Sequence, residues 1–465
     1  MHAIWRNNGL DMEKFYTIVE EQKKRYMEEL FCFLKQKSIS ATGEGIDQTV
    51  EMLRDYMETA GIRTRLLPTS GHPAVYGEVI TSPVLPTVLI YGHYDVQPAD
   101  EKDGWDQDPF TPFIRNERIF CRGSSDDKGQ LFTHIKAVEA WHSVYGSLPL
   151  NLKFLFEGEE ETGSPNLNDL VRENAALLQC DLVVISDSHI HESQRPTIIL
   201  GLKGMLYIQL CAMGASKDLH SKFAASVESP VWRLLQLLGT MRDCNGNILI
   251  DGFYDSIKLP TEAEKKAIEA IPYDKEQILK NLGADALRSS ETYGDHYFWN
   301  MMFEPTCNID GIIAGYTEEG AKTVLPSSAK VKIDFRLVPG QDPQDILDKL
   351  KRHLEKYGFG DITVKQEGMM YPSRADAESP YVQAIAEAIT AAWGQSPLIY
   401  PSIGGSGPNY IFTQNLGVEC ITVPYAGADQ NNHGVNENML VKGFYNGIKT
   451  NGEMIKRLSV LGGVK

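Results

Sequence analysis

Apolar runs in the first half of the chain are each followed directly by polar, ionisable residues. Residues 87–91, 150–156 and 182–185 form short, strongly apolar runs, and residues 129–145 between the first two look helical. Continuous apolar strands alternating with helices are typical of a mostly parallel sheet that helices cover. The pattern therefore predicts an α/β domain whose ligand-binding groups lie beyond the carboxyl ends of the strands.

The chain near each end fits the same domain. Between residues 11 and 37, apolar side chains recur at helical spacing among Glu, Lys and Arg, which predicts a surface helix with one buried stripe. After residues 371–381 the chain returns to a helix and to a buried strand at 418–423.

A second block begins near residues 201–204. It contains strand-like residues 205–213, a helix candidate at 231–241, an alternating strand at 329–338 and a strand at 362–366. A helix begins at Pro343 with Asp342 as its N-cap and continues to about residue 357. These elements predict a small two-layer α/β domain of residues 203–372, inserted into a first domain of residues 1–202 and 373–465. Residues 243–300 lack clear periodicity and give no prediction.

Composition narrows the choice of partners. The 465 residues include 45 basic and 62 acidic side chains, a net charge of −17, which argues against nucleic-acid and anionic-membrane binding. The seven cysteines are scattered and never form a Cys-x-x-Cys pair, which favours a reducing compartment. Residues 1–10 lack the apolar core of a signal peptide, and no run approaches ~18 apolar residues. We expect a cytoplasmic protein.

His93 and Asp95 stand at positions i and i+2 directly after the apolar run at 87–90, so both side chains leave the strand on the same side. A ligating histidine usually has its second ring nitrogen held by a carboxylate, which suits a metal site. A packed histidine beside an aspartate gives the same pattern, and the pair alone does not separate the two interpretations.

Four further segments carry ionisable residues. They are Gly123-Ser124-Ser125-Asp126-Asp127-Lys128-Gly129, Glu157-Gly158-Glu159-Glu160-Glu161-Thr162-Gly163-Ser164, Ser186-Asp187-Ser188 and Asn432-His433-Gly434. Together with His93 and Asp95, and in this order and spacing, they resemble the M20 family of di-metal peptidases and amidohydrolases. The resemblance covers nearly the whole chain and is closest to the branch of cytosolic non-specific dipeptidase and carnosinase.

The resemblance implies a centre of two metal ions. His93 and Asp187 would bind one ion, Glu161 and His433 the other, and Asp126 would bridge them. Mixed imidazole and carboxylate ligands suit Zn²⁺ best, and also Mn²⁺ or Co²⁺. Asp126 fits the family motif Asp-x-Lys-Gly better than Asp127, whose side chain should point elsewhere. A cis peptide bond often follows the bridging aspartate in the family.

Catalytic roles follow from the same resemblance. Glu160 would be the general base that takes a proton from a metal-bridging water and returns it to the leaving amine. Asp95 would hold and tune His93. A solvated acidic loop is the alternative for residues 157–161, and their place after a buried strand disfavours it. His189 and His191 fall outside the family pattern, so surface or supporting roles are expected for them.

The inserted domain would supply the remaining groups. The resemblance implies that His220 reaches the active site of the partner subunit and stabilises the oxyanion, although Lys222 replaces the family's usual Gly. Arg336 would grip the substrate carboxylate, with Thr323 and the loop carrying Gly405 and Ser406 nearby. Related dipeptidases have a His where this chain reads Tyr371-Pro372-Ser373-Arg374, so Arg374 is assigned part of that contact. A solvated loop histidine, a surface ion pair and an ordinary turn are the corresponding structural alternatives.

The resemblance implies a metal-dependent hydrolase that cleaves dipeptides or short peptides near a free carboxylate. It also implies that the catalytic domain is residues 1–202 and 373–465, and that residues 203–372 form a lid through which the protein is a dimer. An N-acyl amino acid deacylase or a carboxypeptidase with the same metal core is the alternative. The family tends to have Asp at the position of Asp187 in dipeptidases and aminopeptidases and Glu in the other two, which favours a dipeptidase. A non-catalytic metal-binding scaffold is disfavoured because every ligand position and the base position are filled.

Overall fold

The computed structural model describes residues 11–461, which form two compact units. The first comprises the chain up to Leu200, Ala375–Tyr400 and the residues from Ile411 onward, and the second comprises Gly201–Arg374 and Pro401–Tyr410. The short strands β9 (Gly201–Leu202) and β16 (Ser373–Arg374) pair with each other, so both belong to the second unit rather than to the first. Residues 1–10, on which the signal-peptide argument rests, lie outside the described part.

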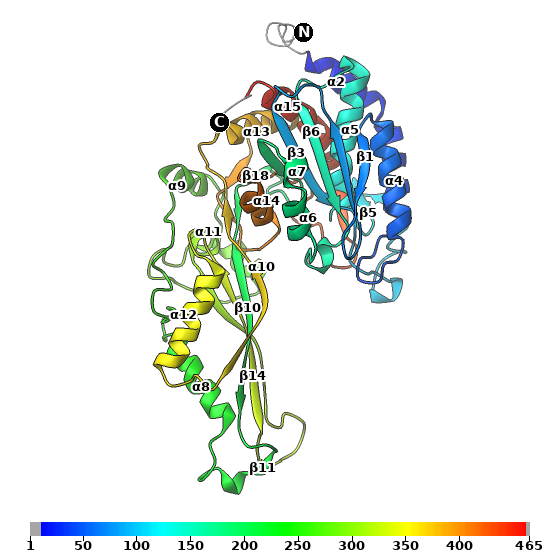
Figure 1. The fold of residues 1–465 in the computed structure, drawn as a ribbon. Coiled ribbons are helices and arrows are strands. Elements are labelled where there is room, and N and C mark those ends of the chain that lie inside the picture. The colour runs from blue at the N-terminus through cyan, green and yellow to red at the C-terminus, as the bar shows by residue number, and fades with distance from the viewer. Residues whose placement is uncertain (1–10, 462–465) are drawn as a thin grey trace. The chain divides into compact units, whose positions relative to one another are not determined.

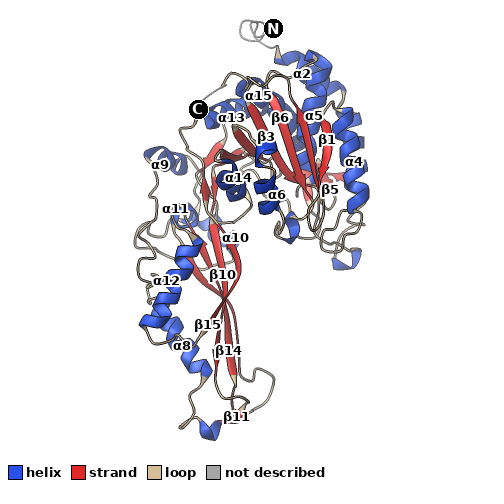
Figure 2. Ribbon diagram, viewed as in Figure 1, coloured by secondary structure: helices blue, strands red, loops and turns tan. Residues whose placement is uncertain are grey.

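The first unit contains an eight-stranded sheet in the order β1-β2-β6-β3-β7-β18-β8-β17 (Figures 1 and 2). Its strands are β1 (Arg63–Leu67), β2 (Ala74–Val79), β3 (Thr87–His93), β6 (Asn151–Glu157), β7 (Leu182–Ile185), β8 (Thr197–Ile199), β17 (Leu398–Tyr400) and β18 (Glu419–Thr422). The central strands β6, β3, β7 and β18 are parallel, and the antiparallel pairs are β1–β2, β2–β6 and β18–β8. The predicted α/β class with a mostly parallel sheet is confirmed.

Helices cover this sheet. They are α2 (Met12–Glu21), α3 (Lys23–Lys35), α4 (Ile46–Thr59), α5 (Lys128–Tyr145), α6 (Leu167–Glu173), α7 (Ala175–Leu178), α13 (Pro380–Trp393), α14 (Asn409–Leu416) and α15 (Val441–Leu458). Helix α15 packs against both α5 and α13, and α5 lies against β3. The single helix predicted for residues 11–37 is wrong, because the backbone at Gln22 (φ −90°, ψ 0°) separates α2 from α3.

A small sheet beside the main one connects two distant loops. It has the order β19-β5-β4, formed by β4 (Phe113–Arg115), β5 (Arg118–Phe120) and β19 (Asn438–Leu440). Asn438 pairs with Phe120. The loop that leads to α5 therefore leaves β5 beside the loop that enters β19.

The second unit is a four-stranded antiparallel sheet with helices on it, which confirms the two-layer α/β prediction. Its strand order is β12-β14-β10-β15, formed by β10 (Gly204–Met213), β12 (Thr306–Ala314), β14 (Ser328–Leu337) and β15 (Thr363–Met370). Helices α8 (Pro230–Met241) and α12 (Pro343–Lys356) pack against the sheet, and alternate residues of β10 are buried. A separate pair joins β11 (Leu219–His220) to β13 (Val324–Leu325).

The segment that gave no prediction contains short helices. They are α9 (Glu262–Glu269), α10 (Lys275–Leu282) and α11 (Tyr297–Phe303). Each has only two turns, too few for a 3.6-residue period to stand out in the sequence. Among the residues from 11 to 461, no helix combines the length and apolar character needed to cross a bilayer.

Candidate metal centre

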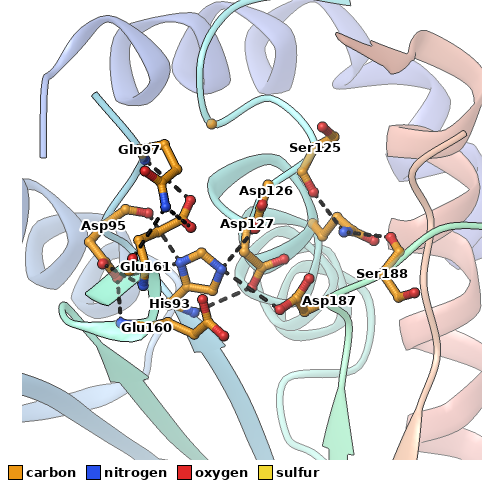
Figure 3. Close-up of polar contacts among 12 residues, drawn as sticks. His93, Asp95, Gln97, Ser125, Asp126, Asp127, Glu160, Glu161, Asp187 and Ser188 are labelled. Carbon is orange, nitrogen blue, oxygen red and sulfur yellow. Dashed lines mark hydrogen bonds and ion pairs between the residues drawn. The ribbon is translucent and has the colours of Figure 1, made fainter. Parts of the chain in front are cut away.

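The ionisable residues meet where the parallel strands end (Figure 3). His93 is the last residue of β3, and Asp187 follows two residues after β7. The short 3-10 turn Glu160–Thr162 follows β6, and Asp126 lies just before α5. The strand ends thus bring together His93, Glu161 and Asp187, as the pattern of apolar runs predicts, and Asp126 joins them from the loop before α5.

Two groups of metal-binding atoms share the carboxylate of Asp126. In the first group, Nε2 of His93 lies 3.0 Å from Oδ1 of Asp126 and 3.8 Å from Oδ2 of Asp187. In the second, Nε2 of His433 lies 3.1 Å from Oδ2 of Asp126 and 3.0 Å from Oε2 of Glu161. The structure therefore brings together the same five residues to which the family resemblance gives ligand roles.

The buried carboxylates of this cluster favour the binding of cations. Burial, and then the charge of Asp126, raise the pKa of Asp187 to about 7. Burial also raises the pKa of Glu160 well above its usual value; His93 opposes this shift and the neighbouring carboxylates add to it. Hydrogen bonds to Asp126 and Glu161 raise the pKa of His433 to about 10. Carboxylates crowded together in this way are stabilised in their ionised form by a nearby positive charge.

The residues fit two divalent ions. The two groups offer two imidazoles and three carboxylates, one of them shared, which is a suitable donor set for Zn²⁺, Mn²⁺ or Co²⁺. The nearby buried lysine, Lys128, donates instead to the carbonyl oxygens of Phe33 and Gln36. Within the described chain it therefore does not pair with the carboxylates of the cluster.

Asp95 connects the two halves of the centre. Its Oδ1 lies 3.4 Å from Nδ1 of His93, as the sequence pattern suggests. Its two oxygens also accept hydrogen bonds from the backbone N–H groups of Glu160 and Glu161, at 3.2 and 3.1 Å. Asp95 therefore orients the turn that carries the predicted base and a predicted ligand, which the sequence did not reveal.

Asp127 lies outside both groups of metal-binding atoms. Its Oδ2 accepts a hydrogen bond from the backbone N–H of His93 at 3.3 Å. A Cβ atom on Gly92 would lie 2.7 Å from that oxygen, so glycine is needed there for close approach. The peptide bond between Asp126 and Asp127 is cis, as the resemblance suggests. The side chain of Asp127 therefore supports β3 and does not face the ligand atoms.

Two glutamines that the sequence reading overlooked hold the loops. The side chain and backbone N–H of Gln97 both donate to the Glu161 carboxylate, at 3.0 and 3.2 Å. Gln130 donates to the carbonyl oxygens of Ser125 and Ser188, next to Asp126 and Asp187. Amides inside apolar helical or loop sequence give no pattern that would mark them.

His189 and His191 take no part in either group of metal-binding atoms. Nδ1 of His189 contacts the carbonyl of Ile190, and Nδ1 of His191 contacts the Ser193 hydroxyl. Both contacts are local to the loop after β7, in line with the supporting or surface roles expected for them.

Comparison with known proteins now gives the family. Residues 89–457 match the model of peptidase family M20/M25/M40. The chain belongs to this family. It is 31% identical to the Cys-Gly metallodipeptidase dug1 of Schizosaccharomyces pombe, over 95% of this chain and 97% of that protein. It is 28% identical to the Beta-Ala-His dipeptidase of Rattus norvegicus, over 89% of this chain and 84% of the relative.

Among solved structures, the chain resembles an M20 family metallo-carboxypeptidase, Sso-CP2 from Sulfolobus solfataricus. The TM-score is 0.86 and the identity 38%, over 94% of this chain and 99% of that one. The chain is therefore an enzyme of the M20 metallopeptidase type. The relatives named as dipeptidases and the one named as a carboxypeptidase all match along most of its length.

The second unit of this M20 peptidase places its candidate residues in three positions. Arg336 lies on β14. Its Nε donates a hydrogen bond to Oδ1 of Asp334 at 2.9 Å, and its Nη1 donates one to the Ser406 hydroxyl at 2.9 Å. The adjacent Gly405 accepts a hydrogen bond from the backbone of Lys203. Arg336 and the Gly-rich loop thus form one polar group within this unit.

His220 and Thr323 lie together at the β11–β13 pair. The exposed ring of His220 accepts a hydrogen bond from the backbone N–H of Lys222, and the carbonyl of Thr323 accepts one from Ser221. Arg374 is placed elsewhere: its Nε lies 3.0 Å from Oε1 of the buried Glu264, and its guanidinium lies over the Phe303 ring. The short helices α9 and α11, which supply these partners, had no predicted position.

Proposed function

We propose that this M20 peptidase uses two divalent metal ions to cleave dipeptides or short peptides next to a free carboxylate. The observation that carries the proposal is the pair of metal-binding groups around Asp126, with Glu160 beside them. His93 and Asp187 are the proposed ligands of one ion, and Glu161 and His433 of the other. Asp126 is the proposed bridge.

When bound, the two ions would polarise the substrate carbonyl and make a water molecule easier to ionise. Glu160 is the proposed general base. Its backbone N–H is held by Asp95, and its carboxylate lies beside His93 in Figure 3. Burial raises the pKa of the Glu160 carboxyl group. Its carboxylate is therefore a stronger base, which can accept a proton from the attacking water and return it to the leaving amine.

Substrate selection would begin with the free carboxylate. Arg336 is held by Asp334 on one side, which leaves its guanidinium oriented toward the Ser406 hydroxyl. Arginine binds carboxylates through two parallel hydrogen bonds, so we assign the substrate carboxylate to Arg336 and Ser406. The ion pair with Glu264 favours a structural role for Arg374 over the substrate contact expected from the sequence.

A carboxypeptidase activity is the second candidate, and the 38% identity to Sso-CP2 supports it. Both activities need the same carboxylate contact and differ in what the site accepts on the amino side of the cleaved bond. Asp187 and the dipeptidase relatives favour the dipeptidase. For this reason we rank Cys-Gly and β-Ala-His dipeptides first among substrates to test, since the relatives' names contain them.

The second unit supports a homodimer. Edge strand β12 exposes Ile309, Ile312 and Ile313, and α8 of the same unit exposes Trp232. An unpaired strand edge with apolar side chains is a ready site for association with a second copy. We propose that this unit joins two chains and that His220 and Thr323 act at the site of the partner subunit. The seven free cysteines fit the cytoplasmic location that we propose.

A screen of reconstituted protein tests the function. Chelator-treated protein is restored separately with Zn²⁺, Mn²⁺ and Co²⁺ and assayed with free-amine dipeptides, tripeptides and N-acyl amino acids. The proposal expects the free-amine dipeptides to have the highest kcat/KM. Faster release of the C-terminal residue from tripeptides would favour the carboxypeptidase, and preference for N-acyl amino acids a deacylase. Two bound metals with no hydrolysis in any set would support a non-catalytic scaffold.

A further inference from the structure

Arg122 and Glu437 form a buried ion pair where two loops leave the small sheet. Nη1 of Arg122 lies 2.8 Å from Oε2 of Glu437, and their side chains are 3% and 0% exposed. Arg122 follows the end of β5 by two residues, and Glu437 directly precedes β19. The pairing of Asn438 with Phe120 holds these positions side by side although they are more than 300 residues apart in the chain.

Glu437 holds the loop that leads to Asp126. Oε2 accepts a hydrogen bond from the backbone N–H of Gly123 at 3.0 Å. Oε1 accepts hydrogen bonds from the backbone N–H and hydroxyl of Ser125, at 2.8 and 2.9 Å, and from the backbone N–H of Asp126 at 3.1 Å. One carboxylate therefore fixes the backbone N–H groups of Gly123, Ser125 and Asp126.

Arg122 holds the other loop. Its Nη2 donates to the carbonyl oxygens of His433 and Gly434, at 3.4 and 3.2 Å. His433 and Asn436 both have φ of 57°, a left-handed conformation that costs free energy in residues other than glycine. A loop with this backbone needs contacts from outside itself, and Arg122 supplies two of them.

We propose that the Arg122–Glu437 pair is a positioning element that fixes the spacing between Asp126 and His433. The inference rests on the metal-ligand assignment proposed above. Neither residue belongs to the two groups of ligand atoms, and both contact the backbone of the loops that carry the ligands. A metal site tolerates only small displacements of its ligands, so groups that orient the ligands control its affinity. Because the two charges cancel, the pair adds no net positive charge beside the cation site.

If the Arg122–Glu437 pair had only a structural role, its removal would have a different result. Removing one partner of a buried pair destabilises the fold whether or not it orients ligands. The affinity for metal separates the two roles, because a structural pair would lower the unfolding temperature and leave metal binding in the folded protein unchanged.

The test is R122K, in which an ammonium group cannot reach Glu437 and both carbonyl oxygens at once. Chelator-stripped protein is titrated with Zn²⁺ in competition with a chromogenic chelator, and H433A identifies the binding step that depends on His433. The inference expects R122K to weaken that step about 10–100-fold. The other step should stay close to that of the wild type. Far-UV circular dichroism of each stripped variant checks the fold.

R118K is the matched control. Arg118 lies on the adjoining strand β5 and bonds to Asn438 and Asp429. It makes none of the contacts that Arg122 makes with Glu437, His433 and Gly434. It should bind both ions as the wild type does.

E437Q is the second variant, and it replaces R122K if that protein does not fold. An amide in place of the carboxylate puts an N–H₂ group against backbone donors, so the shared ligand Asp126 should be displaced and both binding steps weakened. Wild-type Zn²⁺ affinities in folded R122K or E437Q would overturn the inference. If H433A itself kept both binding steps, the ligand assignment of the proposed function would fail instead. A weaker binding step in R122K could then not be attributed to the position of His433.

Discussion

Oδ2 of Asp95 accepts a hydrogen bond from the backbone N–H of Glu161 at 3.1 Å. The same carboxylate lies 3.4 Å from the His93 ring. Asp95 therefore contacts one proposed ligand from each metal site, so its loss should disturb both sites rather than the His93 site alone.

Replacement of Asp95 by Asn should lower Zn²⁺ affinity at both sites, by about 10–100-fold, because an amide nitrogen cannot accept one of the two backbone hydrogen bonds. Competition titration of the stripped protein measures both steps. Asp181→Asn is the control, since Asp181 accepts a hydrogen bond from the backbone of Thr87 at the opposite end of β3. A change confined to one step would show that Asp95 serves His93 only.

Replacement of Glu160 by Gln should leave metal binding nearly intact and lower kcat by about 10²–10⁴-fold, the range for loss of a general base. The amide keeps the size of the side chain and cannot accept the proton. Glu159→Gln is a suitable control, because the Glu159 carboxylate bonds to Asn166 and Thr69 instead. Near-normal turnover in the Glu160 variant would assign the base to another residue.

Four of the site residues that the sequence predicted share one property. His93, Glu160, Glu161 and Asp187 end or follow strands whose apolar pattern is strong, so their place at a strand end could be read directly. Asp126 and His433 were predicted only through the family resemblance. Arg122 and Glu437 were missed because they act on the backbone of loops that only the β5–β19 pairing brings together. No local period or spacing marks a side chain that bonds to backbone groups far away in sequence.

The helices and strands also differ in how well the sequence predicted them. Long apolar strands and the helix capped by Asp342 were predicted closely, since each contains several turns or alternations of pattern. The break at Gln22 was missed because the residues around it remain amphipathic on both sides. Helices of seven or eight residues, such as α9 and α11, owe their stability to tertiary contacts more than to their own sequence.

Replacement of Arg336 by Lys should raise KM about 10–100-fold for substrates with a free carboxylate, because lysine cannot form the bidentate hydrogen bonds that arginine forms with a carboxylate. Hydrolysis of the corresponding C-terminal amides should change much less. Steady-state kinetics on both substrate forms measure the difference. Arg233→Lys, which alters an ion pair with Asp361 on the same unit, is the control. Equal effects on acid and amide would remove Arg336 from carboxylate binding.

Mixing two inactive variants tests whether His220 acts across the dimer. In a heterodimer of H220A and E160Q chains, one site has an intact Glu160 and receives His220 from the other chain. Random re-association should therefore restore about one quarter of wild-type activity. Introducing Ile313→Asp on the exposed edge of β12 into both chains should abolish the recovery, because it prevents association. No recovery in mixed dimers shown to exchange subunits would place His220 at its own chain's site.

The buried ring of His134 should lower the free energy of unfolding of the metal-free protein at acidic pH. Burial lowers the pKa of its ring to about 3, while the unfolded chain keeps a value near 6.5. Between these values only the unfolded state binds the proton, so stability falls as the pH drops below about 6.5. The loss should be about 2 kcal/mol between pH 7.5 and pH 5.

His134→Gln tests this prediction, because the amide can still bond to the Ser186 hydroxyl without titrating. Urea unfolding of both proteins at the two pH values measures the difference. Equal losses in wild type and variant would mean that His134 takes up no proton on unfolding.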